Sequence, residues 1–385
     1  MSDPQPKSKP LVVGVGAAAG GMEALQELLA SLGDSPDMAV VFVAHDASEL
    51  QASRLVQLAN ATSLPVVELK SRQLIRPNTV YICPPNSLLS ISSGSRLMLK
   101  PATEETSSTP IDHFFHSIAE TQGEQGVGVI LSGMGTDGTL GLKSISDAGG
   151  MTFTQLASSA QFDSMPRHAA TTGVADHVLT PEEIANELND YVAYRKQQSN
   201  NLTRESMLDE IERSIPEIAD VLYNATKHNF KHYKTATLTR RILRRMQILQ
   251  ISDVATYSER LRDDQDETQN LFRELLIGIT AFFRDPDSFE SLADEVIPRL
   301  FEGRTSNDPV RIWVPGCATG EEAYSLAILC YEHLDRLKTQ WGDDRTNESL
   351  PTFQIIASDI DEHALAIARQ GIYPLGIADS ISEAR

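Results

Sequence analysis

The sequence predicts an α/β protein with a doubly wound, mainly parallel sheet, followed by a small all-α domain and the start of a Rossmann-like α/β domain. Three observations predict this order. Residues 10–194 alternate short β-like runs with helical stretches, which is typical of a parallel sheet covered by helices. Residues 206–277 have several helical periods and no strand-like run. In residues 310–325 an apolar run leads through a glycine turn into a helix, the start of a nucleotide-type site.

The strands of the first domain are expected at the apolar runs of residues 11–15, 39–43, 79–83 and 126–131. Amphipathic spacing predicts the helices between them at residues 22–32 and 111–121. A further strand with its own turn, at an edge of the sheet, is expected at residues 90–100.

Polar composition marks the expected boundaries. Residues 1–9 are proline-rich and are predicted to form a disordered leader, and residues 195–205 are predicted to form a linker. The predicted domains are therefore an α/β domain, a helical domain and a second α/β domain, at residues 10–194, 206–277 and 278–385.

Composition excludes several classes of protein. The formal net charge of −20 argues against general nucleic-acid binding. No apolar run approaches the ~18–20 residues that span a bilayer, and the N-terminus lacks a signal-peptide core, so direct membrane insertion is not expected. Three cysteines without paired spacing argue against a disulfide framework or a zinc site. We therefore predict no metal and a reducing, cytoplasmic compartment.

The turn after residue 314 precedes a helix that begins with Glu321 and Glu322, and a second apolar run ends on Asp359. A glycine turn lets a ligand approach the backbone, and an acid ending the next strand can accept hydrogen bonds from ribose hydroxyls. Because the two glutamates would repel phosphate, this pattern favours a cationic ligand such as S-adenosylmethionine. An ordinary βαβ unit with a tight turn is the alternative.

The upstream motif Ile279-Thr-Ala-Phe-Phe-Arg-Asp-Pro286 adds to this pattern. With Pro-Gly-Cys-Ala-Thr-Gly-Glu-Glu-Ala-Tyr-Ser and Ala-Ser-Asp-Ile-Asp, it makes the region resemble the chemotaxis receptor methyltransferases (CheR type). One departure is Gly278, where the family usually has asparagine, so one side-chain contact to the methyl donor is in doubt. Only two strands precede Arg385, and the transferase is expected to be truncated and inactive as written. The resemblance implies that the donor is contacted by Thr280, Arg284, Glu321 or Glu322, and Asp359.

Three pieces of the first domain follow predicted strands, where α/β proteins place their sites: Val15-Gly-Ala-Ala-Ala-Gly-Gly21, His45 and Ser132-Gly-Met-Gly-Thr-Asp-Gly138. With Tyr81-Ile-Cys-Pro-Pro-Asn86, Ile111-Asp-His-Phe-Phe-His-Ser117 and Met165-Pro-Arg167, they make the domain resemble the chemotaxis receptor methylesterases (CheB type). An NAD site is the alternative for the glycine turn. It fits poorly, because the third glycine is displaced and the second strand ends on a histidine.

The methylesterase family uses a Ser-His-Asp triad, in which serine attacks a glutamyl methyl ester, histidine takes its proton and aspartate orients the histidine. The resemblance makes His45 the base and Asp137 its orienter, but Ala18 occupies the position of the nucleophile. Losing one triad member typically costs on the order of a million-fold in turnover, so we predict no ester hydrolysis by this mechanism. A natural degenerate domain kept for binding and an engineered serine-to-alanine change both fit the alanine.

Residues 227–245 contain seven Lys/Arg and no acid. Helical spacing places four of these side chains on one side of a helix: Arg240, Arg241, Arg244 and Arg245. One interpretation is a solvated face, or a face paired with acids such as Asp263, Asp264 and Asp266. The other is a docking surface, and the methyltransferase resemblance favours this, because that family presents a basic helix to the Glu-containing region of chemoreceptors.

The whole sequence resembles CheB–CheR fusion proteins of chemosensory signalling, which add and remove γ-methyl esters on glutamates with S-adenosylmethionine as the donor. The implied partner is a chemoreceptor helix or another Glu-containing signalling domain. Nine residues before Pro10 leave no room for a receiver domain, so phosphorylation-gated ester release is not expected. The competing hypothesis is a catalytically dead esterase-fold scaffold or partner-binding module, which Ala18 and Gly278 favour.

Overall fold

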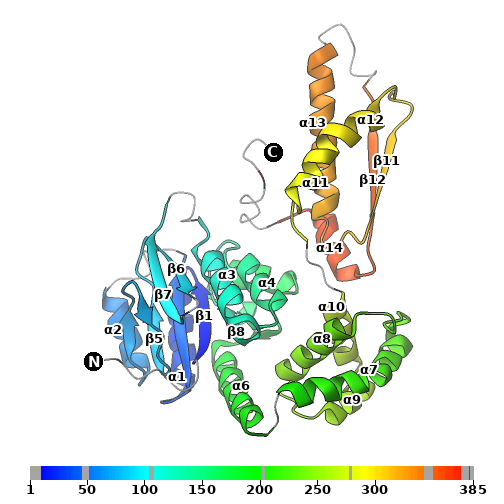
Figure 1. Ribbon diagram of the computed structural model, residues 1–385. Coiled ribbons are helices and arrows are strands. Elements are labelled where there is room, and N and C mark those ends of the chain that lie inside the picture. The colour runs from blue at the N-terminus through cyan, green and yellow to red at the C-terminus, as the bar shows by residue number, and fades with distance from the viewer. Residues whose placement is uncertain are drawn as a thin grey trace. The chain divides into compact units, whose positions relative to one another are not determined.

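The computed structural model describes residues 10–45, 52–92, 94–103, 108–201, 204–276, 280–341, 350–373 and 381. The predicted leader 1–9 and Gly278 lie outside these residues. The chain divides into two compact units, Met1–Leu275 and Leu276–Arg385, each described by itself (Figure 1). Within the described ranges, every helix is too short or too polar to cross a membrane.

A seven-stranded sheet forms the centre of the first unit, in the order β10-β9-β8-β1-β2-β5-β3. Adjacent strands of this sheet all run parallel to each other. The predicted strands are β1, β2, β5 and β8, and the fold class is confirmed. The bounds are β1 (Leu11–Ala17), β2 (Met38–Ala44), β3 (Val66–Glu68), β5 (Thr79–Ile82), β8 (Gly126–Ile130), β9 (Met151–Gln155) and β10 (His177–Leu179).

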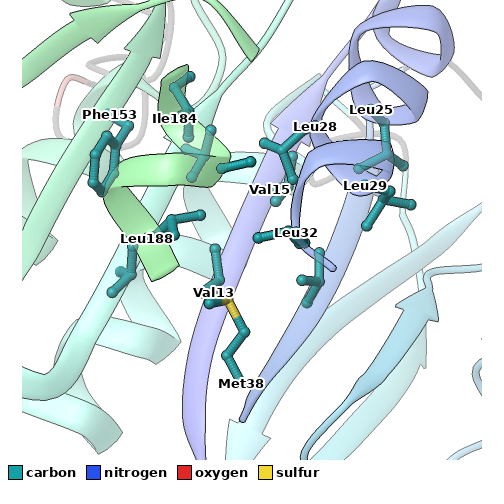
Figure 2. Packing of buried hydrophobic residues seen from close by; sticks show 14 of the residues in the cluster. Val13, Val15, Leu25, Leu28, Leu29, Leu32, Met38, Phe153, Ile184 and Leu188 are labelled. Atoms are coloured by element: carbon teal, nitrogen blue, oxygen red, sulfur yellow. The ribbon is translucent and has the colours of Figure 1, made fainter. Parts of the chain in front are cut away.

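Helices cover both faces of this sheet, because successive strand residues point to opposite sides. Val13 and Val15 pack with α1 (Gly21–Ser31), α2 (Ala52–Ala61) and α6 (Pro181–Asn201). Figure 2 shows Leu25, Leu28 and Leu29 of α1 on that face, beside Ile184 and Leu188 of α6. Val12 packs on the opposite face with α3 (Pro110–Gln122), α4 (Thr139–Asp147) and α5 (Ser164–Thr171). Single turns follow at η3 (Gly123–Gln125) and η4 (Ala157–Ser159).

The strand expected at residues 90–100 is instead a hairpin of two strands, β6 (Ser87–Ser92) and β7 (Arg96–Pro101). With β4 (Gln73–Leu74) it forms a separate antiparallel sheet and does not extend the main one. The turn at Ser95, which has a φ of 53°, reverses the chain direction. The two strands therefore pair with each other.

The helical domain consists of α7 (Arg204–Thr226), α8 (Thr235–Ile248), α9 (Val254–Asp263) and α10 (Gln265–Leu275). Asp253 caps α9, because its carboxylate accepts a hydrogen bond from the Thr256 amide at 2.7 Å. Residues 195–201 of the predicted linker 195–205 are helical, because α6 continues to Asn201, and α7 begins at Arg204; residues 202–203 lie outside the described residues. A polar composition is equally compatible with an exposed helix, so it did not mark a break.

The second unit contains two parallel strands, β11 (Val310–Pro315) and β12 (Phe353–Ser358), paired residue by residue. Its helical elements are α11 (Pro286–Ser291), a π turn η5 (Leu292–Val296), α12 (Ile297–Phe301), α13 (Glu321–Trp341) and α14 (Glu362–Gln370). Phe283, Phe289, Val310 and Leu329 belong to its buried apolar cluster. The cluster joins β11 and α13, the two elements that the glycine turn connects.

Candidate functional site

Three neighbouring strands of the first unit end at the same edge and bring the triad positions together. The His45 amide donates to the Ala17 carbonyl at 2.8 Å, and the Ala18 amide donates to the Ser132 carbonyl at 3.0 Å. The loops after β1, β2 and β8 are therefore bonded directly to one another. This edge lies at the point where the strand order reverses around β1, the usual place for a site in such a sheet.

His45 and Asp137 form an ion-pair contact, with 2.9 Å between Nδ1 and Oδ2. Asp137 is also held by the first turn of α3, where its carboxylate accepts hydrogen bonds from the amides of Ile111 at 3.1 Å and Asp112 at 3.0 Å. An ionised Asp137 makes Nδ1 the protonated nitrogen of a neutral His45, which leaves Nε2 as the basic atom. The His45 side chain is 35% exposed and that of Asp137 is 3% exposed.

Ala18 occupies a tightly packed position, with 6% of its surface exposed. A side chain on Gly133 would come within 2.9 Å of the Ala18 methyl group and of Met165, so only glycine fits there. Gly20 has a φ of 71°, which allows the turn into α1. The position is built closely around a small residue, and a methyl group there cannot act as a nucleophile.

The Ser132 hydroxyl lies against this turn and is occupied by hydrogen bonds to the backbone. It donates to the carbonyls of Ala19 at 2.9 Å and Phe162 at 3.3 Å, and it accepts from the Phe162 amide at 3.0 Å. Ser132 is fully buried. Its hydroxyl therefore ties the loops of residues 18–20 and 161–162 together.

Asp112 lies within the motif Ile111–Ser117, but nothing in the sequence alone indicates that it belongs to the site. Its Oδ1 accepts from the Gly141 amide at 2.7 Å, and its buried Oδ2 has no hydrogen-bond partner among the described residues. Burial, and then the charge of Asp137, raise the pKa of Asp112 to about 8. The carboxyl group is therefore neutral below that pH, beside the carboxylate that orients His45.

The glycine turn of the second unit is organised by carboxylates. Asp359, at the end of β12, accepts from the Ala318 amide at 2.7 Å, and Glu321 accepts from the Thr319 hydroxyl at 2.6 Å and 2.8 Å. The two acids therefore flank consecutive residues of one loop. Gly316 has a φ of 68°, and a Cβ there would meet open space, so a ligand can approach its backbone.

The carboxylates of Asp359 and Glu321 make the electrostatic potential at this loop negative. Burial raises the pKa of the Cys317 thiol, and Asp359 and then Glu321 raise it further. Burial, and then Glu321, raise the pKa of the Tyr373 hydroxyl, which donates to the Thr319 carbonyl at 2.6 Å. The carboxylates of Asp359 and Glu321 at this loop favour a cation over a phosphate, which they would repel. The residues present therefore fit S-adenosylmethionine, which carries an ammonium group and a sulfonium.

The other residues assigned to the donor lie around the same helix start. The Phe283 amide donates to the Ser325 hydroxyl at 3.0 Å, which ties the segment before α11 to the first turns of α13. Within that segment Thr280 is half-buried and Arg284 is exposed. Glu322 is exposed, whereas Glu321 is buried.

The arginines of α8 do not form the exposed surface that the sequence suggested. Arg240 is exposed, but Arg241, Arg244 and Arg245 are 4%, 3% and 8% exposed. Arg241 and Arg244 both bind Glu274, and Arg245 binds Glu267. The interpretation that these arginines pair with acids therefore holds for three of them. The acids, however, are not the suggested Asp263, Asp264 and Asp266. Three of the four arginines are therefore too buried to belong to the predicted docking surface, and only Arg240 is exposed.

Family models match the chain in three consecutive stretches. These are the CheB methylesterase at residues 13–188, the all-alpha domain of the CheR methyltransferase at 213–276 and its SAM binding domain at 279–385. The chain joins a CheB methylesterase domain to the two domains of a CheR methyltransferase. The carboxylate-lined loop after β11 lies in the S-adenosylmethionine-binding domain.

Curated relatives match different parts of this order. The chain is 36% identical over 341 residues to the "Uncharacterized 104.1 kDa protein in hypE 3'region" of Rhodobacter capsulatus, covering 83% of this chain and 35% of that protein. It is 37% identical to "Protein-glutamate methylesterase/protein-glutamine glutaminase 3" of Anaeromyxobacter dehalogenans, over 46% of this chain and 52% of that protein. "Putative methyltransferase Cher3" of Pseudomonas putida is 34% identical, over 41% of this chain and 51% of that protein.

The chain thus spans between 35% and 52% of the length of these three relatives. Among solved structures, the catalytic domain of the Thermotoga maritima CheB methylesterase aligns with a TM-score of 0.44 and 24% identity, over 48% of this chain and 99% of that chain.

Proposed function

We propose that the chain belongs to a chemosensory protein that acts on methyl esters of glutamate side chains, with an esterase half that binds but does not hydrolyse them. In this proposal residues 10–194 form the esterase half, and residues 206–277 and 278–385 form the transferase half. Its substrate is a Glu-containing helix of a chemoreceptor or of another signalling domain. The observation that carries the proposal is the His45–Asp137 pair, in loops whose backbone is hydrogen-bonded to the turn that holds Ala18.

The chemistry of the esterase half follows from the roles in a hydrolase triad. His45 Nε2 would take a proton from a hydroxyl at position 18, and Asp137 would stabilise the imidazolium that forms. Ala18 offers no proton and no lone pair, so the histidine has no nucleophile to activate. What remains is the His45–Asp137 pair with a basic nitrogen, which would bind an ester or a side-chain amide without cleaving it.

The transferase half needs few chemical groups. S-adenosylmethionine supplies an electrophilic methyl group when bound. In this proposal Asp359 would accept hydrogen bonds from ribose hydroxyls, and Glu321 and Glu322 would favour the cationic end of the donor; the contacts of Asp359 and Glu321 with the glycine turn support these roles. No base is required, because a substrate glutamate is already ionised near neutral pH. The protein therefore acts by aligning two reactants and excluding water.

The esterase part is tested by methanol release from methylated chemoreceptor membranes. The chain as it stands should release no methanol above background. Ala18→Ser should raise the rate on the order of 10⁴- to 10⁶-fold, because the rest of the triad is assembled. Robust release by the unaltered chain would refute the proposal, and His45→Ala in the Ala18→Ser background is the control for a triad mechanism.

A second candidate function is a scaffold without catalysis in either half, and Ala18 is the observation that favours it. Calorimetry with S-adenosylmethionine on a chain extended to the length of its relatives separates the two. A transferase should bind the donor, and Asp359→Asn should weaken binding about tenfold, ~1.4 kcal/mol. The exposed Asp190→Asn is the matched control. Absence of donor binding in the folded, extended protein would favour the scaffold.

A further inference from the structure

Helix α8 makes its strongest contact outside its own domain through Arg244. Nη2 of this guanidinium donates to both carboxylate oxygens of Asp176, at 3.0 Å and 2.9 Å. It also donates to the Gly150 carbonyl and the Ser146 hydroxyl, both at 3.1 Å. All three acceptors belong to the esterase half, at the end of α4 and beside β9 and β10. Arg244 therefore belongs to the transferase half but donates hydrogen bonds to residues of the esterase half.

The acceptor group on the esterase half is built into the sheet. Asp176 accepts from the Thr152 amide at 2.9 Å and from the Thr152 hydroxyl at 2.8 Å. These two hydrogen bonds orient the Asp176 carboxylate and do not involve Arg244. On the other side of Arg244, Glu274 of α10 accepts from Nη1 at 2.6 Å. Burial alone would lower the pKa of Arg244, but Asp176 and then Glu274 offset this, and its pKa is raised.

Neighbouring contacts extend the same interface along α6. Ile248, at the end of α8, packs into the main apolar cluster of the esterase half. The Tyr194 hydroxyl donates to the Ile251 carbonyl at 3.1 Å, and the Gln250 amide donates to Glu187 at 2.6 Å. The interface thus combines one buried ionic contact with a limited number of apolar and polar contacts. Removing either Arg244 or Asp176 from such an interface would leave the other charge buried without this partner, which is strongly destabilising.

We propose that the esterase half is an intramolecular partner of α8, and that an acidic helical segment of a signalling partner gains access to Arg244 only when Asp176 releases it. A carboxylate can take the place of Asp176 at Nη2 and accept the same hydrogen bonds, while Glu274 stays on Nη1. The partner is therefore an acidic helix that offers glutamates to α8. This inference rests on the proposed function for the nature of the partner, whereas the intramolecular contact stands on the distances above.

The test uses the full chain and a fluorescein-labelled synthetic helical peptide with glutamate at every fourth position, followed by fluorescence anisotropy. Asp176→Asn removes the competing charge but keeps an oxygen that can accept from Thr152. It should bind the peptide about tenfold more tightly than the unaltered chain, and more weakly as salt is raised. Adding Arg244→Gln should abolish the gain.

The matched control is Asp220→Asn, which makes the same chemical change in an exposed ion pair with Lys231, with side chains 63% and 58% exposed. It should leave peptide affinity unchanged. If Asp176→Asn does not fold, Ser146→Ala removes one acceptor of Arg244 and should give a smaller gain in the same direction. Hydrogen exchange of the α8 amides should rise in either variant.

Peptide affinity that does not change in a folded Asp176→Asn chain would overturn the inference, as would tight binding by the unaltered chain. Donor binding is measured on the same variants, made in the extended chain that is used for calorimetry. Its loss in every variant counts against the proposed function, whereas unchanged donor binding with unchanged peptide affinity counts against this inference alone.

Discussion

The triad site and the Arg244 contact both join charged side chains from distant segments, but they differ in where the paired charge faces. His45 is 35% exposed while Asp137 is 3% exposed, so one end of that pair can reach a molecule outside the protein. Arg244 and Asp176 are 4% and 8% exposed, so that pair acts within the protein. An ion pair with one exposed member suits chemistry on a ligand, and a pair with two buried members holds parts of a chain together.

The largest effect is expected at Asp137. In the Ala18→Ser background, Asp137→Asn should lower the rate of methanol release on the order of 10⁴-fold, because an amide cannot hold His45 in the required tautomer. Asp190→Asn, an exposed carboxylate on α6, should leave the rate unchanged. Equal rates for Asp137→Asn and its background would mean that the pair does not serve catalysis, and the contrast with Arg244 would fail.

The next largest effect is expected at Arg244. Arg244→Met removes the guanidinium that pairs with the Asp176 carboxylate and leaves Glu274 paired with Arg241 alone, and the free energy of unfolding should fall by about 3–5 kcal/mol. Arg240→Met removes the same group from an exposed position of the same helix and should change stability by less than ~0.5 kcal/mol. Urea unfolding of both variants gives the comparison. Similar values for the two would show that Arg244 is not a buried structural charge.

A smaller effect concerns pH and Asp112. Its pKa in the folded protein is raised to about 8, above the ordinary value of 3.8 for an aspartate. The folded state therefore holds a proton that the unfolded state loses, and this contribution to stability is lost as pH rises toward 8. Between pH 6 and pH 7 the loss should approach ~1.4 kcal/mol. Asp112→Asn should flatten that slope in urea unfolding; the exposed Asp190→Asn should keep it.

The proximity of Ala18, His45 and Asp137 could be predicted from the sequence, because they lie in short motifs at strand ends, whereas their roles as a triad remain predictions. Parallel strands bring such positions to one edge without further information. The same reasoning assigned Glu321 and Asp359 to one loop, and both flank it. Their roles toward a ligand remain predictions.

The partners of the arginines could not be predicted, since Asp176 precedes Arg244 by 68 residues and lies in another domain. Helical spacing places charges on one face, but it does not say what packs against that face. The raised pKa of Asp112 was hidden for the same reason, because it depends on how α3 packs against α4 and Asp137. The helical continuation through residues 195–201 was missed because polar residues suit both loops and exposed helices.

The central claim is that the esterase half lacks its nucleophile and otherwise holds an assembled triad. Phenylmethylsulfonyl fluoride reacts with a serine activated by such a pair, and intact-mass spectrometry detects the adduct without any choice of natural substrate. Ala18→Ser should gain a single sulfonyl group at position 18, and neither the unaltered chain nor the Ala18→Ser/His45→Ala variant should gain one. A folded Ala18→Ser variant that stays unmodified would contradict the account.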